Sequence, residues 1–329
     1  MVLLFALACS TAADPTAPTP APATPAPAAA APAAEEPPAP SPTGDRGPWV
    51  TPPPSVVPAA ERIIAFADVH GDLDATRAAL RLGGLIDAED RWVGGATVAV
   101  QTGDQLDRGD GERAILDLFE RLSEEAWAAG GAFYPLLGNH ETMNVALDLR
   151  YVTPGGFADF ADLSLPGGHP LAGQVRPEAQ GRVAAFSPGG PYANRLAGHN
   201  AVMQVGDTVF THGGVLPIHA EHGLDVINRS IQAWMVGQAP APEVWIGSEG
   251  PLWTRLYSDG APSPEACATL DETLEKLGAS RMVVGHTVQP APSAACDGKV
   301  WRMDVGMAAH YGGTPAVLEI QGDTVRVLR

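Results

Sequence analysis

Five short clusters of aspartate, histidine, asparagine and glycine constrain this chain more than any other feature, because each one directly follows an apolar segment. The clusters are residues 68–72 (DVHGD), 103–109 (GDQLDRG), 138–141 (GNHE), 211–214 (THGG) and 285–287 (GHT). The apolar segments before them have the length and composition of buried strands. Ligand sites in open α/β sheets collect at the carboxyl ends of strands. We therefore expect the five clusters to meet at one sheet edge and form a single site.

Strand and helix signals alternate from about Glu61 onward, which predicts an α/β fold. Strands are expected over 62–67, 97–101, 132–137, 281–284 and 300–304, and helices over 73–82, 111–129 and 264–277. Hairpins are expected at 201–211 and 316–328, so the sheets should mix parallel and antiparallel strands. Residues 155–190 are rich in glycine and proline and exceed what a helix crossover needs. We interpret them as a cap-like insertion that shapes substrate access.

The first 59 residues carry a different signal. Residues 2–8 form an apolar run that ends in small residues directly before Cys9, and residues 10–59 are dominated by proline and alanine. The start resembles a bacterial lipoprotein signal peptide, which implies a lipidated Cys9, and the segment after it is expected to be a disordered linker. The expected location is therefore extracytoplasmic, in the periplasm or at the cell surface, on a membrane anchor. An uncleaved or misassigned N-terminus is the alternative.

The charge balance argues against one class of partner, and the number of cysteines bears on a possible disulfide. Acidic residues outnumber basic ones by 38 to 20, for a formal net charge of −18. This excess argues against a nucleic-acid partner, because phosphates need a basic surface. The two later cysteines, Cys267 and Cys296, form an even pair that an oxidising compartment would allow to join in a disulfide. Two unrelated buried thiols are the alternative.

Taken together, the five clusters resemble those of the calcineurin-like metallophosphoesterases, and the DRG at 107–109 narrows the resemblance to the phosphoprotein phosphatase branch. Four longer segments are similar to the Shewanella-like protein phosphatases, namely 138–152 (GNHETMNVALDLRYV), 250–257 (GPLWTRLY), 284–289 (VGHTVQ) and 304–320 (DVGMAAHYGGTPAVLEI). The resemblance covers nearly all of residues 61–329 and implies mixed β-sheets packed with flanking helices. It departs at Ala67, where phosphoprotein phosphatases usually have glycine. It also departs at Val288, where the broader family has histidine and the Shewanella-like motif often has proline.

The resemblance implies a centre of two divalent metal ions. Asp68 and His70 would hold the first ion, Asp104 would bridge both, and the second would be held by Asn139, His212 and His286. These ligand types suit manganese, iron and zinc, of which we expect manganese. A carboxylate can bridge ions roughly 3.5–4 Å apart, and a bridging hydroxide can attack phosphorus in line. The centre would keep a charge of about +1, which attracts a phosphate dianion.

A second group of residues is implied to act on the phosphate and on the leaving group. The resemblance assigns His140 as the general acid, with Asp107 orienting its ring. Arg108 would hold phosphate oxygens through its bidentate fork, and Arg255 would be a second phosphate-binding arginine. Further candidates at the rim of the site are Arg150 and Tyr151.

These expectations describe a dinuclear-metal phosphomonoesterase that acts on phosphorylated protein, at serine, threonine or tyrosine. A nucleotide or small-molecule phosphohydrolase is the alternative, because diadenosine-tetraphosphate hydrolases resemble the same branch. A third interpretation is a non-catalytic binding lipoprotein on a phosphatase fold. The presence of every implied ligand, together with His140, argues against it. The sequence leaves the oligomeric state open.

Overall fold

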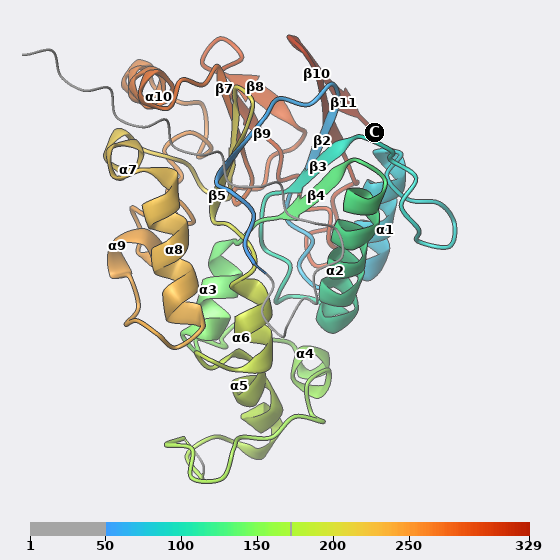
Figure 1. Cartoon of the computed structure of the whole chain (residues 1–329), viewed down its shortest axis with the longest axis vertical. Coiled ribbons are helices and arrows are strands. Elements are labelled where there is room, and N and C mark those ends of the chain that lie inside the picture. The colour runs from blue at the N-terminus through green and yellow to red at the C-terminus, as the bar shows by residue number, and fades with distance from the viewer. Residues whose placement is uncertain (1–50, 172) are drawn as a thin grey trace, which may run out of the picture. The chain divides into compact units, whose positions relative to one another are not determined.

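The structure is a computed structural model that describes residues 51–171 and 173–329. The expected signal peptide, the lipidation site at Cys9 and most of the expected linker lie outside the described residues. Two mixed β-sheets pack face to face between two layers of helices (Figure 1). This arrangement confirms the expected fold class. None of the described helices combines the length and the apolar character that crossing a membrane requires.

A five-stranded sheet, in the order β11-β10-β2-β3-β4, carries three of the five polar clusters at its strand ends. The three parallel strands are β2 (Ile63–Phe66), β3 (Val98–Gln101) and β4 (Ala132–Pro135). The expected terminal hairpin is present as β10 (Val317–Gln321) and β11 (Thr324–Leu328), and β10 runs antiparallel to β2.

Both faces of this sheet are covered, as β2 shows. Ile64 and Phe66 pack in the core cluster with helices α1 (Leu73–Leu82) and α2 (Glu112–Ala128). Ile63 and Ala65 point the other way, into the core cluster shared with the second sheet. Burial on both faces explains why β2 is a continuous apolar run instead of an alternating one.

The six-stranded sheet has the order β1-β5-β6-β7-β9-β8 and carries the other two clusters. Its strands are β1 (Val56–Val57), β5 (Val202–Val205), β6 (Thr208–Thr211), β7 (Arg281–Val284), β8 (Ser293–Ala295) and β9 (Val300–Arg302). Helices α8 (Leu224–Met235) and α10 (Pro264–Leu277) pack in one core cluster with β5, β6 and β7. The polar clusters after β6 and β7 lie side by side because these two strands are parallel neighbours.

The prediction of a disordered linker over residues 10–59 is wrong for the last of these residues, because β1 is a strand of the six-stranded sheet. It pairs in parallel with β5, and the main-chain bonds of Gln204 N to Ser55 O and of Gly206 N to Val57 O measure 2.8 and 3.0 Å. Ser55 itself is buried. The strand is only two residues long and its partner lies far away in the chain, so no local pattern indicates it. The ordered domain begins before residue 60.

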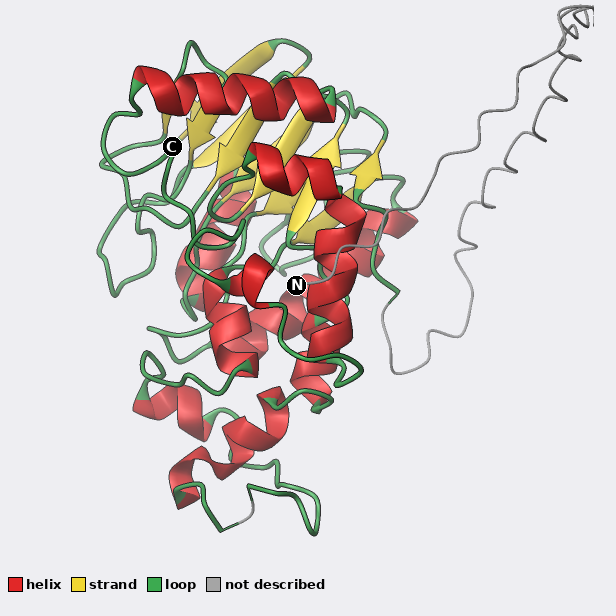
Figure 2. Cartoon of the chain, turned by 90° about the vertical axis from the view of Figure 1, so that its left-hand side faces the viewer, coloured by secondary structure: helices red, strands yellow, loops and turns green. Residues whose placement is uncertain are grey.

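The insertion lies at the end of the sheets where α3 (Asn139–Val145) begins (Figures 1 and 2). Residues 154–196 form α4 (Pro154–Ala158), the short η1 (Pro177–Ala179), α5 (Gln180–Phe186) and α6 (Pro191–Leu196). Arg195 of α6 joins this region to α2 through ion pairs with Glu120 and Asp117 of 2.5 and 2.8 Å. The insertion is therefore docked on α2 as well as placed near the strand ends. The remaining helices are α7 (Pro217–His222) and α9 (Glu243–Ile246).

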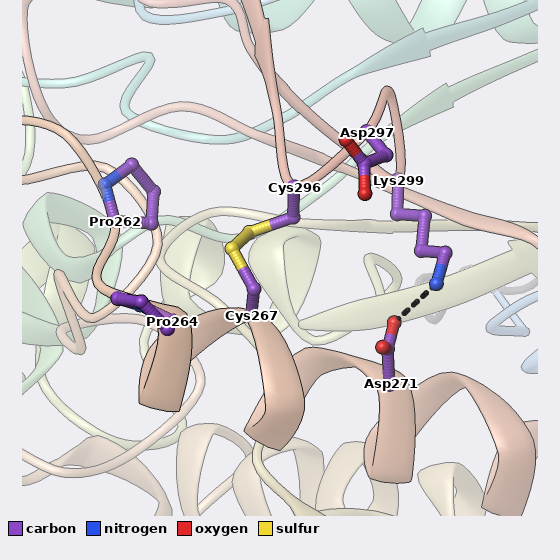
Figure 3. A pocket seen from close by; sticks show the side chains of 7 residues that line it. All are labelled: Pro262, Pro264, Cys267, Asp271, Cys296, Asp297 and Lys299. Carbon is purple, nitrogen blue, oxygen red and sulfur yellow. Dashed lines mark hydrogen bonds and ion pairs between the residues drawn. A yellow bond between two sulfur atoms is a disulfide. The ribbon is translucent and has the colours of Figure 1, made fainter.

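A disulfide joins Cys267 of α10 to Cys296, directly after β8 (Figure 3). The two cysteines are 29 residues apart in the sequence. An ion pair of 2.6 Å between Lys299 and Asp271 lies beside the disulfide and makes a second link between α10 and the start of β9. These links hold α10 against the edge of the six-stranded sheet.

Candidate metal centre

The loops after β2, β3, β4, β6 and β7 bring the five clusters together. The expectation of a single sheet edge is wrong, because β2, β3 and β4 belong to the five-stranded sheet and β6 and β7 to the six-stranded one, so the packing of the two sheets is what joins the clusters. Two groups of possible ligands form there, and within each group the ligand atoms lie within 4.8 Å of one another. One group is His70, Asp104 and His140, and the other is Asp104, His212 and His286. Asp104 is shared by both groups, which is the position expected of a bridging carboxylate.

The other two expected ligands lie beside these groups. Asn139 Oδ1 is 2.9 Å from His212 Nε2, so the asparagine joins the second group. Asp68 Oδ2 is 3.8 Å from His70 Nε2, and Asp68 Oδ1 accepts a hydrogen bond from the main-chain nitrogen of His286. His140 takes the third place in the first group, where Asp68 is expected from the sequence. All six expected ligands are nevertheless buried in one cluster.

Backbone strain concentrates at these residues. Among the described residues, nine that are not glycine have a positive φ, and five of them are candidate site residues, with φ between 41° and 70°, namely His70, Asp104, Asp107, Arg108 and His286. Such left-handed conformations cost roughly 1–2 kcal/mol each and persist only where the surroundings impose them. The fold therefore holds these side chains in place at an energetic cost.

Two glycines allow the loop after β2 and the loop after β3 to come into contact. A Cβ on Gly109 would lie 2.4 Å from the carbonyl oxygen of His70, and one on Gly71 would lie 2.7 Å from the carbonyl carbon of Gly109. Any larger residue would push the loops apart. The glycines of DVHGD and DRG thus serve a close backbone contact that brings His70 next to Asp107 and Arg108.

Glu141, the last residue of GNHE, fastens the loop after β3 to α3. One carboxylate oxygen accepts hydrogen bonds from the main-chain nitrogens of Gln105 and Leu106, and the other from those of Asp104 and Gly138. The four distances lie between 2.6 and 3.1 Å. Sequence reasoning assigned Glu141 no role, yet it fixes the backbone on which the bridging candidate Asp104 stands.

The three histidines among the expected ligands are prepared to bind a metal. One ring nitrogen of each faces a main-chain carbonyl oxygen: Nδ1 of His70 faces Leu106 at 3.0 Å, Nδ1 of His212 faces Thr102 at 2.9 Å, and Nε2 of His286 faces Trp253 at 3.1 Å. A hydrogen bond of this kind fixes the tautomer and leaves the other nitrogen as a free ligand. Burial lowers the pKa of His70 to about 4 and also lowers the pKa of His286, so both rings are neutral near pH 7.

The buried carboxylates next to these histidines favour the binding of cations. Burial, followed by repulsion from Asp304 and Asp104, raises the pKa of Asp68 well above its usual range. Burial likewise raises the pKa of Asp304 to about 6. Three buried acids this close together repel one another, and divalent cations would relieve that repulsion. Neutral imidazoles, carboxylates and one amide oxygen around a shared aspartate are a donor set that fits two divalent ions.

His140 and Asp107 form a hydrogen-bonded pair next to this centre. His140 Nδ1 is 2.6 Å from Asp107 Oδ2, and both side chains are buried. Burial disfavours the charged ring, but Asp104 and the bond to Asp107 outweigh it and raise the pKa of His140 to about 8. Because Nδ1 is occupied by Asp107, the free nitrogen is Nε2, which lies 3.8 Å from Asp104 Oδ2. His140 therefore holds a proton at the edge of the candidate centre.

The three arginines expected from the sequence differ in the hydrogen bonds and ion pairs that their guanidinium groups already make. The guanidinium of Arg108 stacks on the ring of Tyr151 at 3.9 Å, and within residues 51–171 and 173–329 no carboxylate forms an ion pair with it. Arg255 Nη1 donates to the carbonyl oxygen of His286 and to Thr287 Oγ1, each at 2.8 Å. The exposed Arg150 pairs with Asp148 at 2.7 Å. Arg108 is thus the arginine best placed to take an anionic ligand.

Sequence reasoning missed Asp304, Arg182 and Tyr311 as well as Glu141. Asp304 follows β9, so the rule that polar residues after a strand mark the site could have identified it. Tyr311 packs against His70, with 5.4 Å between the ring centroids. Arg182 is buried beneath Asp107, and nothing in the composition of the insertion signals it.

Comparison with known proteins agrees with this geometry. The family model for calcineurin-like phosphoesterases matches residues 61–290. The chain is 39% identical over 302 residues to Shewanella-like protein phosphatase 2 of Arabidopsis thaliana, covering 82% of this chain and 77% of that protein. It is 28% identical to Shewanella-like protein phosphatase 1 of Plasmodium berghei (strain Anka), covering 82% of this chain and 74% of that one.

A solved structure described as a cold-active protein tyrosine phosphatase superposes with a TM-score of 0.70 at 25% identity, covering 84% of this chain and 78% of that chain. These findings confirm the resemblance inferred from the five clusters and the four longer segments.

Proposed function

We propose that this chain, which belongs to the calcineurin-like phosphoesterase family and is a metal-dependent phosphatase, removes phosphate from phosphorylated protein with His140 as the proton donor. One observation carries the proposal. Asp104 is shared by two groups of possible metal ligands, and the Asp107–His140 pair lies beside it. The guanidinium of Arg108 stacks on Tyr151, whose ring packs against His140.

The residues that would hold the two ions follow from the geometry and the donor types. Asp68 and His70 are proposed for the first ion, Asp104 for both, and Asn139, His212 and His286 for the second. Two divalent ions, when bound, lower the pKa of the attacking water and offset the charge of the phosphate dianion. Manganese is the expected metal, with iron and zinc as alternatives.

The chain itself would bind the phosphate and supply a proton. Arg108 can present two parallel N–H donors to phosphate oxygens, because no carboxylate of the described part pairs with it. The ring of Tyr151 beneath it limits how far the guanidinium can swing. Arg255 is proposed to hold the His286 loop through its bond to the carbonyl oxygen, which leaves only its remaining nitrogens for phosphate.

His140 is proposed to donate its Nε2 proton to the oxygen of the leaving group. Asp107 accepts from Nδ1 and thereby leaves Nε2 facing Asp104 in the candidate centre. A serine alkoxide needs this proton most, and a tyrosine phenolate, with a pKa of about 10, needs it less. The contribution of His140 should therefore grow with the basicity of the leaving group.

Phosphotyrosine is the phosphoresidue that the surroundings favour. Tyr311 flanks His70 and Tyr151 flanks His140, with ring centroids 5.4 and 5.2 Å apart, so aromatic surface lies on both sides of the histidine pair. A substrate phenol ring could pack against Tyr311, whose side chain is exposed, whereas the ring of Tyr151 already carries the guanidinium of Arg108. The structural relative described as a protein tyrosine phosphatase supports the same preference.

The test is a substrate panel on the full-length chain after removal of metal. Phosphotyrosine peptides, phosphoserine peptides, nucleotides and an aryl phosphate are each assayed with Mn²⁺, with Zn²⁺ and with no addition. The proposal predicts the highest kcat/KM on a phosphotyrosine peptide in Mn²⁺. Higher kcat/KM on nucleotides than on every peptide would favour the small-molecule alternative and contradict the proposal.

The N-terminal anchor remains a separate proposal, because Cys9 lies outside the described residues. We propose an exported, lipid-anchored enzyme on the basis of the apolar run before Cys9 and the proline- and alanine-rich segment after it. Mass spectrometry of the membrane fraction should detect an N-terminal diacylated Cys9. An exported protein that keeps Met1 would contradict the proposal.

A further inference from the structure

We propose that Arg182, a residue of the insertion, is a positioning residue that holds the Asp107–His140 pair in the geometry needed for proton donation. The inference rests on the proposed role of His140 as the leaving-group acid. Arg182 lies in α5, and its side chain is the largest of the fully buried ones in the described part of the chain. Arginine is almost never fully buried unless its charge is paired, so its partners reveal what it does.

The first partner, Glu112, connects Arg182 to the backbone of Asp107. Both terminal nitrogens of Arg182 bond the carboxylate of Glu112, with Nη2 at 3.0 Å from Oε1, and Nη1 also donates to the carbonyl oxygen of Gly156 at 2.9 Å. The same Oε1 accepts a hydrogen bond from the main-chain nitrogen of Asp107. Asp107 has a φ of 68°, a strained value that the fold must impose. The Arg182–Glu112 pair is one of the contacts that impose it.

The second set of contacts fixes the side chain of Asp107. Arg182 Nη2 lies 3.3 Å from Asp107 Oδ1, and Nε donates to Asn144 Oδ1 at 2.8 Å. The bond to Oδ1 sets the orientation of the Asn144 amide, whose Nδ2 then donates to Asp107 Oδ1 at 3.1 Å and to the carbonyl oxygen of His140 at 2.9 Å. Asp107 Oδ1 thus receives two donors, and Oδ2 is left to face His140 Nδ1.

The geometry has a consequence for the proton. A histidine whose Nδ1–H is held by a carboxylate carries its transferable proton on Nε2. If Asp107 rotates, Nδ1 loses its acceptor and the ring can turn. Arg182 therefore acts on proton transfer through Asp107, without touching the substrate.

The charges of the group agree with this role. Glu112 and Asp107 place two carboxyl groups in a fully buried space, and Arg182 is the buried cation that bonds both of them. Burial raises the pKa of Glu112, and Arg182 opposes that rise. Without Arg182, the two buried carboxyl groups would lose the donor that they share, and Asp107 Oδ1 would keep only the amide of Asn144.

The rival interpretation is that Arg182 only docks the insertion on the rest of the protein. Arg195 offers a matched control for that interpretation. It lies in α6 of the same region and docks it on α2 through Glu120 and Asp117. In the described part of the chain, its side chain has no hydrogen bond to Asp107 or His140. Loss of Arg195 therefore loosens the insertion without disturbing the proton donor directly.

The experiment compares two substrates with full-length, metal-loaded Arg182→Met, the double variant Glu112→Gln/Arg182→Met, and Arg195→Met. One substrate is a phosphoserine peptide, whose alkoxide needs a proton to leave, and the other is p-nitrophenyl phosphate, whose phenolate does not. We expect both Arg182 variants to lose about 10–100-fold in kcat on the phosphoserine peptide, with unchanged metal content. On p-nitrophenyl phosphate the loss should stay below about 3-fold, because no protonation is needed there. Arg195→Met should change both substrates by the same factor.

His140→Ala is measured in the same series, so that the two claims can fail separately. If His140→Ala lowers kcat equally on both substrates, the proposed acid role is wrong, and the inference about Arg182 is wrong with it. If His140→Ala is selective but the Arg182 variants lose the same factor on both substrates, Arg182 has only a docking role. The double variant removes both buried charges together, so it decides the matter if Arg182→Met does not fold.

Discussion

Replacing Glu141 by glutamine should destabilise the whole domain, because a single carboxylate there accepts four main-chain hydrogen bonds. Glutamine keeps one oxygen but turns an NH₂ group toward two of the four N–H donors. Burial, followed by repulsion from Asp104, raises the pKa of Glu141 to about 7, so the comparison is made at about pH 8, where the carboxylate is charged. Two hydrogen bonds to this charged acceptor are lost, at about 1.5–3 kcal/mol each, so the free energy of unfolding should fall by about 3–6 kcal/mol.

The measurement is urea unfolding of the full-length chain, together with Tm and bound metal. For a domain of this size, 1 kcal/mol shifts Tm by roughly 2–4 °C, so a fall of about 6 °C or more is expected. Metal content should fall as well, because two of the bonds hold the main-chain nitrogens of Asp104 and Gln105.

Glu124→Gln is the matched control for this prediction. It makes the same chemical change at an exposed position of α2, where the expected effect is within about 0.5 kcal/mol. If Glu141→Gln proves no more destabilising than Glu124→Gln, then the four bonds do not hold the loop after β3, and the reasoning fails.

Three further changes test the contributions of β1, His140 and Arg108. A fragment of residues 60–329 should be about 1–3 kcal/mol less stable to urea than residues 51–329, because it loses β1 and the two main-chain hydrogen bonds that join it to β5. Equal midpoints would mean that β1 contributes nothing. His140→Ala should lose about 10²–10⁴-fold in kcat on phosphoserine peptides and markedly less on p-nitrophenyl phosphate, and equal losses would refute it as leaving-group acid. Arg108→Lys, which lacks the fork and the stacking on Tyr151, should lower kcat/KM about 10-fold or more on every phosphoester; a loss confined to one substrate would argue against a general phosphate contact.

The parts of the site that were predictable from sequence are those that local chemistry marks. A buried strand followed by a polar loop is visible in the sequence itself, and β2, β3, β4, β6 and β7 all follow that pattern. Because parallel neighbours end at the same edge, the meeting of His212 and His286 after β6 and β7 could be expected from the strand pattern. Asp104 follows β3 of the other sheet, so it joins them only through the packing of the two sheets.

The parts that escaped prediction depend on contacts between distant segments. β1 is two residues long and becomes a strand only because β5, almost 150 residues later, offers it hydrogen bonds. Arg182 sits in an ordinary helical run, and only the tertiary fold places it beneath Asp107. Glu141 looks like a turn residue until the loop after β3 folds onto it. Each depends on partners that local sequence patterns do not show.

Asp104 is proposed to serve two metal ions at once, so the decisive measurement is the number of bound ions against activity. The full-length chain, stripped of metal, is titrated with Mn²⁺ while bound metal and turnover of a phosphotyrosine peptide are measured in the same samples. We expect two ions per chain, with full turnover reached only as the second site fills. Asp104→Asn should bind fewer than two ions and show no measurable turnover. Undiminished turnover by Asp104→Asn, or by a chain holding a single ion, would contradict the central claim.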